Sequence, residues 1–340
     1  MRIGFPCKKI DHPHQVDGIG AKDDCKRYNT IGTTVAWCNR QTREVAEQRL
    51  WDIMVHNIKA VKLLVEWVSQ QDPHLRMVRI GSDVLNMFTE PTWRSFYHRG
   101  DVRNYCERHF AEVGEIARQR DVRLSMHPGQ FVVLGSDNPD IVERSIEEFE
   151  YHATVASWMG YGRSFQDFKI NVHISGRAGP EGVRQSYSRL SPEARNCITI
   201  ENEEITWGLG SCLELVDIIP IVLDIHHHFI NTGEYIETTD QRVKRVIDSW
   251  RGVRPVAHYS VSPEHLLVDH ARDRLPDLRT LMESGHRKQK LRAHSDFYWN
   301  SAVNDWALTF LEIHDLMCES KGKNLSSLAL YAYARQQGLF

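Results

Sequence analysis

Several familiar signatures are missing from this sequence. Its seven cysteines are scattered along 340 residues and form no CxxC pair, which argues against a zinc ribbon. An odd number of cysteines in a long chain also favours a reducing compartment over a disulfide framework. No apolar run approaches 18 residues, and the first five residues do not look like a signal peptide. We therefore expect neither membrane insertion nor secretion.

Two further absences narrow the function. The segment Gly4-Phe5-Pro6-Cys7, after the start of the first expected strand, forms neither a dinucleotide fingerprint nor a P-loop. The formal net charge of −3 gives no overall sign of a nucleic-acid partner. Locally, however, residues 161–195 carry six Lys or Arg against three acids, and residues 271–292 carry seven against three. These two basic segments are candidate contacts for a DNA backbone.

Apolar segments typical of strands alternate with helical patterns along the chain. This alternation predicts an α/β fold with a parallel sheet, and eight strand–helix units favour a closed (β/α)8 TIM barrel. We expect residues 1–340 to form one domain, with a loop over 11–40 and a polar insertion near 262–300. The expected strands are 1–5, 77–81, 122–126, 168–174, 197–201, 220–225, 255–258 and 315–319. The expected helices are 43–71, 104–120, 139–159, a short one from 191, 212–218, 240–250, 303–312 and 325–337.

Side chains that can bind metal stand at most of the expected strand ends. In a TIM barrel these ends meet at one mouth, so the side chains should converge. Imidazoles and carboxylates suit Zn or Mn, and one ion needs about four protein ligands, so eight candidates indicate two or three divalent ions. The candidates are His127, His173, Glu201, Asp224, His227, His258, Glu319 and, from the insertion, His294.

Each of these residues, taken alone, could instead have a purely structural role. A single histidine near a strand end is more often a hydrogen-bonded core residue than a ligand. Six consecutive strand ends that each carry a potential ligand are improbable by chance, so the joint pattern favours a metal cluster. We expect His226 and His228 to be bystanders, because alternation along a strand would turn them away from His227.

Short motifs around these positions resemble those of the UV damage endonucleases, TIM-barrel DNA repair enzymes related to the endonuclease IV type of apurinic endonuclease. The resemblance covers most of the chain and rests on the order and spacing of the motifs, since any single one would be weak. The motifs are Arg79-Ile80-Gly81-Ser82, His127-Pro128-Gly129-Gln130-Phe131, His173-Ile174-Ser175-Gly176, Glu201-Asn202-Glu203-Glu204, Asp224-x-x-His227, His258-x-Ser260, His294-Ser295-Asp296 and Glu319-Ser320-Lys321.

The resemblance implies roles for these residues. Glu201 would bridge two ions, with His127 and His173 completing the first site. The second site would be completed by Asp224, His258 and Glu319, which with Glu201 form the implied catalytic set. A third ion would be held with the help of His227 and His294.

Gln130 and Phe131 match the two probing residues of the family, which wedge into the duplex where damaged bases are flipped out. An apolar wedge offsets part of the cost of unstacking a base step. The alternative for Phe131 is a loop residue that packs on Val132 and Val133.

Three positions depart from the family pattern. Phe5 replaces a usual tyrosine, and as a further candidate for DNA probing it can stack but cannot donate a hydrogen bond. Val256 stands where many members carry a carboxylated lysine, so the metal shell must differ. Glu90 aligns with a family histidine and is either an additional oxygen ligand or a surface residue.

The resemblance implies a metal-dependent hydrolase acting in excision repair. It would nick duplex DNA immediately 5′ to cyclobutane pyrimidine dimers, 6-4 photoproducts and abasic sites, leaving 3′-hydroxyl and 5′-phosphate ends. We expect two or three divalent ions, with Mn first and Zn, Mg or Co as alternatives. The expected partner is damaged double-stranded DNA, bound by a monomer in the cytoplasm or at the nucleoid, with no membrane involved.

Three other functions share part of this pattern. A general apurinic endonuclease would have the same cluster without recognising photoproducts. A sugar isomerase of the xylose isomerase type would need a compact sugar pocket and no wedge, so Gln130, Phe131 and the basic insertion argue against it. A non-catalytic DNA-binding protein with a decayed centre would hold no metal.

Overall fold

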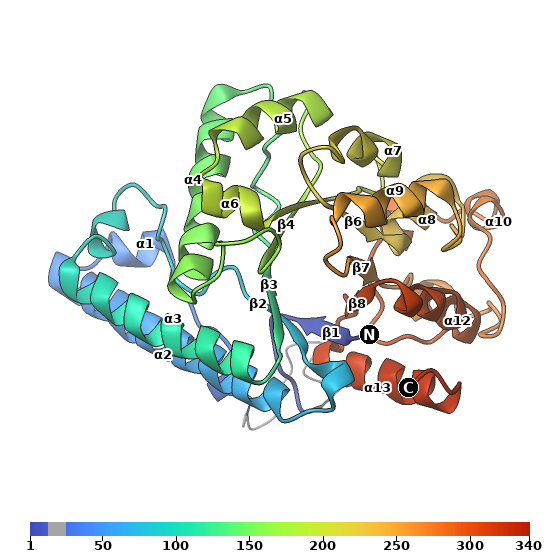
Figure 1. Cartoon of the computed structure of the whole chain (residues 1–340), viewed down its shortest axis with the longest axis horizontal. Helices are drawn as coiled ribbons and strands as arrows, with labels where there is room; N and C mark the ends of the chain where they lie inside the picture. Colours follow the sequence, from blue (N-terminus) through green and yellow to red (C-terminus); the bar gives the residue numbers. More distant parts are fainter. Residues whose placement is uncertain (13–24) are drawn as a thin grey trace.

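The computed structural model describes residues 1–12 and 25–340, so part of the predicted loop over 11–40 lies outside the described residues. Eight parallel strands follow one another around a closed barrel, and β1 pairs back to β8. Each expected strand is present, which confirms the predicted TIM barrel (Figure 1). The strands are β1 (Ile3–Pro6), β2 (Met77–Ile80), β3 (Arg123–Met126), β4 (Lys169–His173), β5 (Ile198–Glu201), β6 (Ile221–Asp224), β7 (Val256–Tyr259) and β8 (Asp315–Cys318).

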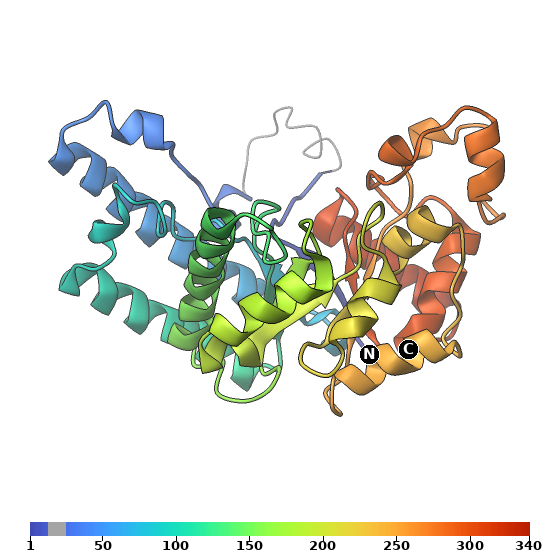
Figure 2. The same ribbon diagram turned by 90° about the horizontal axis from the view of Figure 1, so that it is seen from above.

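Helices cover the outside of the barrel, and the two long helices α2 and α3 lie side by side along one flank (Figures 1 and 2). Side-chain caps explain several starts: Thr42 caps α2, Asn138 caps α4 and Asp240 caps α9. The α-helices are α1 (Val35–Cys38), α2 (Arg43–Ser69), α3 (Gly100–Gln119), α4 (Pro139–Trp158), α5 (Gly179–Arg189), α6 (Pro192–Cys197), α7 (Leu209–Cys212), α8 (Ile225–Thr232), α9 (Gln241–Ser249), α10 (Leu278–Glu283), α11 (Lys288–Leu291), α12 (Ser301–Thr309) and α13 (Lys323–Gln336). Short 3-10 turns are η2 (Lys26–Tyr28), η3 (Pro73–Leu75), η4 (Arg94–Phe96), η5 (Leu213–Leu215), η6 (Glu264–Leu266) and η7 (Phe310–Glu312).

The insertion over 262–300 has more structure than its polar sequence predicted. It contains η6, α10 and α11, and Leu267, Leu278, Leu281 and Leu291 pack into a small apolar cluster. Phe229 and Ile230 of α8 belong to the same cluster. The insertion is therefore anchored to the helix that follows β6. A further helix, α5, was also not predicted; it begins at Gly179, and Pro180 occupies its first turn.

The expected strand over 220–225 and the histidines that follow it are divided between two elements. Strand β6 ends at Asp224 and helix α8 begins at Ile225. The Asp224 carboxylate accepts a hydrogen bond from the backbone N–H of His227 at 2.7 Å, which is the contact of a helix N-cap. The expected strand over 220–225 therefore ends one residue early, and the assumption that His226 and His228 lie on a strand was wrong, because Asp224 starts a helix.

The end of the barrel opposite the strand C-termini is closed by an ion network around Asp315. Its carboxylate accepts hydrogen bonds from Arg123 Nη1 at 2.8 Å, from Arg254 Nε at 2.9 Å and from the backbone N–H of Arg2 at 2.9 Å. Within residues 1–12 and 25–340, none of the helices has the length and apolar character that a membrane span requires.

Candidate metal centre

The strand C-termini converge on a cavity of about 890 Å³ at the barrel mouth. Its walls include four of the predicted histidines and one predicted carboxylate: His127, His173, His227, His294 and Glu319. The side chains of Glu201, Asp224 and His258 lie at its base and are fully buried. All eight residues singled out from the strand ends and the insertion thus lie at one end of the barrel.

Six of these residues form two overlapping groups, within each of which the potential ligand atoms lie within 4.8 Å of one another. The first group contains His127, His173 and Glu201. The second group contains Glu201, Asp224, His258 and Glu319. Glu201 belongs to both, which is the grouping that the family resemblance implied for a bridging carboxylate.

The two oxygens of Glu201 face different imidazoles. Oε1 lies 3.0 Å from His258 Nδ1, and Oε2 lies 3.5 Å from His127 Nε2 and accepts a hydrogen bond from Asn171. Burial alone would raise the pKa of Glu201, but its interactions with His258 and His173 and its hydrogen bonds with His127 and His258 hold it well below the usual range. Its carboxylate is therefore ionised and can bind one cation through each oxygen.

Two histidines of the groups, His173 and His258, are suited to bind metal in their neutral form. Burial lowers the pKa of His173 and of His258 to about 4, despite the opposing effect of Glu201. A neutral imidazole has a lone pair available for a cation. These side chains need not lose a proton when a metal binds at neutral pH.

Asp224 carries a buried oxygen that fits a cation. Oδ1 accepts the hydrogen bond from His227, whereas Oδ2 has no hydrogen-bond partner among the residues that the structure describes. Burial raises the pKa of Asp224 well above its usual value, and neighbouring Glu201 contributes to this increase. A buried carboxylate oxygen without a donor is costly, and a divalent ion would remove this cost.

His227 and His294 belong to neither group. In each ring Nδ1 faces a backbone carbonyl: that of Asn202 at 3.1 Å and that of Glu319 at 2.7 Å, respectively. A carbonyl at one ring nitrogen orients the other nitrogen toward a ligand. His227 Nε2 lies 3.9 Å from Glu204 Oε2. Glu204 could therefore serve as a carboxylate ligand for a third ion held by His227.

Glu204 was quoted only as part of a motif and was given no role. It lines the cavity and pairs with Arg292 of the insertion. Burial would raise its pKa, but His227 and Arg292 lower it. The two adjacent glutamates after β5, Glu203 and Glu204, were the available signal, but the fold of the loop decides which of them faces His227.

His226 and His228 lie outside both groups, as predicted, but for a different reason. They are on helix α8, where successive side chains turn by about 100° around the axis. His228 Nε2 lies 3.0 Å from Glu234 Oε2, on the side away from the cavity. The helix, rather than strand alternation, separates these two rings from His227.

Glu90 and Phe5 do not reach the cavity. The Glu90 carboxylate accepts hydrogen bonds from the backbone N–H groups of Thr92 and Trp93 at 2.8 and 2.9 Å, so it caps a turn. Phe5 is 3% exposed and packs edge-on against Trp67 of α2, with ring centroids 6.0 Å apart. The expectation that Phe5 probes DNA is wrong, because its side chain points out of the barrel into the helix layer.

Lys169 approaches the centre from β4 and was not singled out from the sequence. Its Nζ lies 3.0 Å from His258 Nε2, while His258 Nδ1 faces Glu201. Burial lowers the pKa of Lys169 to about 7, although Glu201 opposes this effect. Val256 packs in the barrel interior against Met77 and Trp250. The barrel therefore does hold a lysine beside His258, but on a different strand from the family's.

Gln130 and Phe131 project from the loop after β3. The Gln130 side chain lines the cavity, and the Phe131 ring is 68% exposed. This exposure argues against the alternative in which Phe131 is buried on Val132 and Val133, although one side of the ring lies over Gly129. Phe131 also borders a second cavity of about 530 Å³, between the loop after β2 and helix α4.

The two basic segments differ in their placement. Residues 161–195 do not form one surface, because they include strand β4 with the buried Lys169. In the same segment Arg184 pairs with Asp217 and Arg189 pairs with Glu143. Residues 271–292 lie in the insertion beside the mouth, and Arg292 lines the cavity. Elsewhere in the second segment, Arg272 pairs with Glu264 and Arg279 pairs with Glu283, so Arg292 is the cation that this segment brings to the candidate centre.

Comparisons with known proteins point to one family. The family model described as "UV-endonuclease UvdE" matches residues 16–337. The chain is 26% identical over 305 residues to the UV-damage endonuclease of Schizosaccharomyces pombe, covering 84% of this chain and 46% of that protein. It is 23% identical over 316 residues to the UV DNA damage endonuclease of Bacillus cereus strain 03BB102, covering 90% of this chain and 88% of that protein.

The likeness extends to a solved structure. The crystal structure of SacUVDE superposes with a TM-score of 0.73 at 22% sequence identity, and the match covers 100% of both chains. This likeness shows a shared fold. The chain spans about half the length of the Schizosaccharomyces pombe relative, so that protein contains further sequence outside the match.

Proposed function

Because the chain belongs to the UV-endonuclease UvdE family, we propose that it is a metal-dependent DNA repair endonuclease that incises duplex DNA immediately 5′ to UV photoproducts. The observation that supports this most is the buried Glu201, shared by two ligand groups at the barrel mouth. The proposed products are a 3′-hydroxyl and a 5′-phosphate, and abasic sites are proposed as further substrates. The proposed partner is damaged duplex DNA, bound by a monomer.

The donor sets suit two different ions. The first group offers two imidazoles and one carboxylate, whereas the second offers three carboxylates and one imidazole. Oxygen-rich sets favour Mn or Mg, and imidazole favours Zn, so we propose Mn with Zn as the alternative in the first group. Divalent cations held there would supply Lewis-acid activation of water and charge stabilisation for a phosphate.

The chain's own residues would orient the substrate. Arg79 lines the cavity and pairs with Glu319, so its guanidinium faces the place where a phosphate would lie. Gln130 and Phe131 stand at the edge of the cavity, where they can enter a duplex that lies across the mouth. Arg292 and its basic neighbours in the insertion would follow the DNA backbone on the other side.

Plasmid nicking tests the proposed function. Supercoiled plasmid would be irradiated with UV, depurinated or left untreated, and incubated with the protein and Mn²⁺. We expect nicking of irradiated plasmid that stops when a chelator is added. DNA polymerase should extend the ends without prior treatment, because they carry a 3′-hydroxyl. Cutting of abasic but not irradiated plasmid would instead identify a general apurinic endonuclease.

Replacement of Phe131 by alanine should lower the incision rate on a dimer-containing duplex by about tenfold or more. Stacking of a base on an aromatic side chain contributes roughly 1–3 kcal/mol, and this contact would be lost. Phe131→Tyr should retain most of the rate. Metal content should be unchanged in both variants, because Phe131 belongs to neither ligand group. Equal rates for Phe131→Ala and the unmodified protein would rule out the wedge.

A further inference from the structure

Three neighbouring loops at the mouth pack into one rigid edge, which we call the rim: residues 127–138 after β3, 174–178 after β4 and 202–208 after β5. A Cβ at Gly176 would overlap the carbonyl of Gly135, and a Cβ at Gly179 would overlap the ring of Trp207. Trp207 Nε1 donates a hydrogen bond to the Gly176 carbonyl at 2.8 Å. Glycine at these positions therefore lets the three loops contact one another closely.

The rim presents a second exposed apolar residue besides Phe131. Ile205 is 46% exposed and lines the cavity that contains the candidate metal ligands. Its loop is fixed on both sides: Glu203 N–H donates to the Trp207 carbonyl at 2.8 Å, and Asn231 Nδ2 donates to the Ile205 carbonyl at 3.3 Å. The position of the Ile205 side chain over the cavity is thus set by the fold.

Ile205 is the one large apolar side chain among the described cavity walls that is exposed, since Val132 and Val172, which also line the cavity, are buried. Next to it lie Glu204 and Arg292, which pair with each other, and the predicted histidines. A single exposed apolar side chain needs no explanation on an open surface. Ile205, however, is exposed inside a cavity and stands beside the Glu204–Arg292 pair, where it can contact an apolar ligand surface. The face of a nucleobase is such a surface.

We propose that Ile205 is a specificity-determining residue that packs against an extruded, damaged base inside the cavity. This inference rests on the proposed function, because it assumes that damaged bases leave the duplex. Phe131 would separate the base step at one end of the rim, and Ile205 would cover the displaced base at the other. The contact distinguishes lesions: a photoproduct has bases to bury, whereas an abasic site has none.

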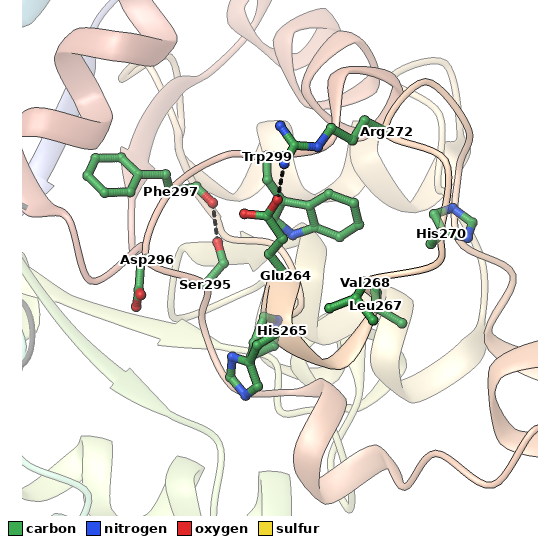
Figure 3. A pocket seen from close by; sticks show the side chains of 11 residues that line it. Glu264, His265, Leu267, Val268, His270, Arg272, Ser295, Asp296, Phe297 and Trp299 are labelled. Atoms are coloured by element: carbon green, nitrogen blue, oxygen red, sulfur yellow. Dashed lines mark hydrogen bonds and ion pairs between the residues drawn. The ribbon is translucent and has the colours of Figure 1, made fainter.

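Val268 is a matched control in the insertion. It is 73% exposed, but it lines a separate cavity of about 640 Å³ beside Leu267, His270 and Trp299. Figure 3 shows Val268 and Leu267 next to each other on the wall of this cavity. None of the residues in the two candidate ligand groups lines that cavity. Val268→Ala removes a comparable apolar surface without touching the rim.

The test measures affinity by fluorescence anisotropy, in chelator so that no DNA is cut. The probes are one duplex with a cyclobutane dimer and one with a tetrahydrofuran abasic analogue. Ile205→Ala should weaken binding of the dimer duplex by about five- to tenfold, because the side chain is already half-buried and only its exposed half would gain burial against the base. Binding of the abasic duplex should stay within twofold, and Ile205→Leu should restore the dimer affinity.

The outcomes separate this inference from the proposed function. Equal losses on both duplexes, or no loss on either, would overturn the role of Ile205 while the protein still recognises damage. An unmodified protein that binds the dimer duplex no better than undamaged DNA would contradict the proposed function and, with it, this inference. Val268→Ala should match the unmodified protein on both duplexes; a selective loss there would show that the effect is not specific to the rim.

Discussion

Glu201→Gln should reduce DNA incision by about a thousandfold, because a loss of roughly 4 kcal/mol of transition-state stabilisation lowers a rate by that factor. Glu201 is the one residue common to both ligand groups, so the change removes a charged ligand from each. Glutamine has nearly the same shape and retains one oxygen, so the barrel should still fold. The defect should therefore appear in the chemistry rather than in stability.

Metal content separates this explanation from a folding defect. Elemental mass spectrometry should find fewer metal ions per chain in Glu201→Gln than in the unmodified protein, whereas the two proteins should unfold at the same temperature in chelator, where neither holds metal. Glu143→Gln is the matched control, since Glu143 pairs with Arg189 on the helix surface. That variant should retain full incision and metal content. The assignment fails if Glu201→Gln cuts within tenfold of the unmodified rate and binds the same amount of metal.

Much of the candidate site could be predicted because residues that follow successive strands of a parallel barrel lie close together at one end of it. Each strand from β3 to β8 ends near a polar residue, and the parallel arrangement brings all those ends to one face. The position of Glu201 follows from this rule alone. The prediction of these positions required no knowledge of the metal. It required only that six strands end at the same mouth of the barrel.

Residues inside the barrel could not be predicted in the same way. Lys169, Asn171 and His173 alternate along β4, which predicts a shared face but not its surroundings. A polar face usually meets solvent, whereas here closure of the barrel turns it inward, so that Lys169 is buried beside His258. The same ambiguity explains the error for Phe5. Its side chain lies on the face of β1 that turns toward the helix layer and away from the barrel interior.

The secondary structure of the segment after β6 could not be predicted from its local sequence pattern alone. A short apolar run followed by histidines fits either a strand or the first turn of a helix. Asp224 resolves the choice, because its side chain caps the helix while its free oxygen faces the ligand group. One residue thus ends the strand, starts α8 and contributes to the candidate metal centre.

Asp315→Asn should destabilise the folded protein by about 3–5 kcal/mol, the usual cost of removing one partner from a buried ion network. Asp315 is 2% exposed, and Arg123 and Arg254 both donate to its carboxylate. The neutral amide would leave buried Arg123 without its counter-ion. Asp217, which pairs with Arg184 at the surface, is the control, and Asp217→Asn should change stability by less than about 1 kcal/mol.

The pH dependence gives an independent check. Burial would raise the pKa of Asp315, but Arg123 and Arg254 hold it below the ordinary value. The stabilisation is therefore fully present above the pKa of the unfolded state, about 3.9, and is lost as pH falls through the lower folded-state pKa. Urea unfolding at pH 7 should show the full difference between the unmodified protein and Asp315→Asn, and this difference should still be nearly complete at pH 5. A difference that already disappears by pH 5 would mean that Asp315 is not held ionised by its arginines, and the ion network would not explain how this end of the barrel is closed.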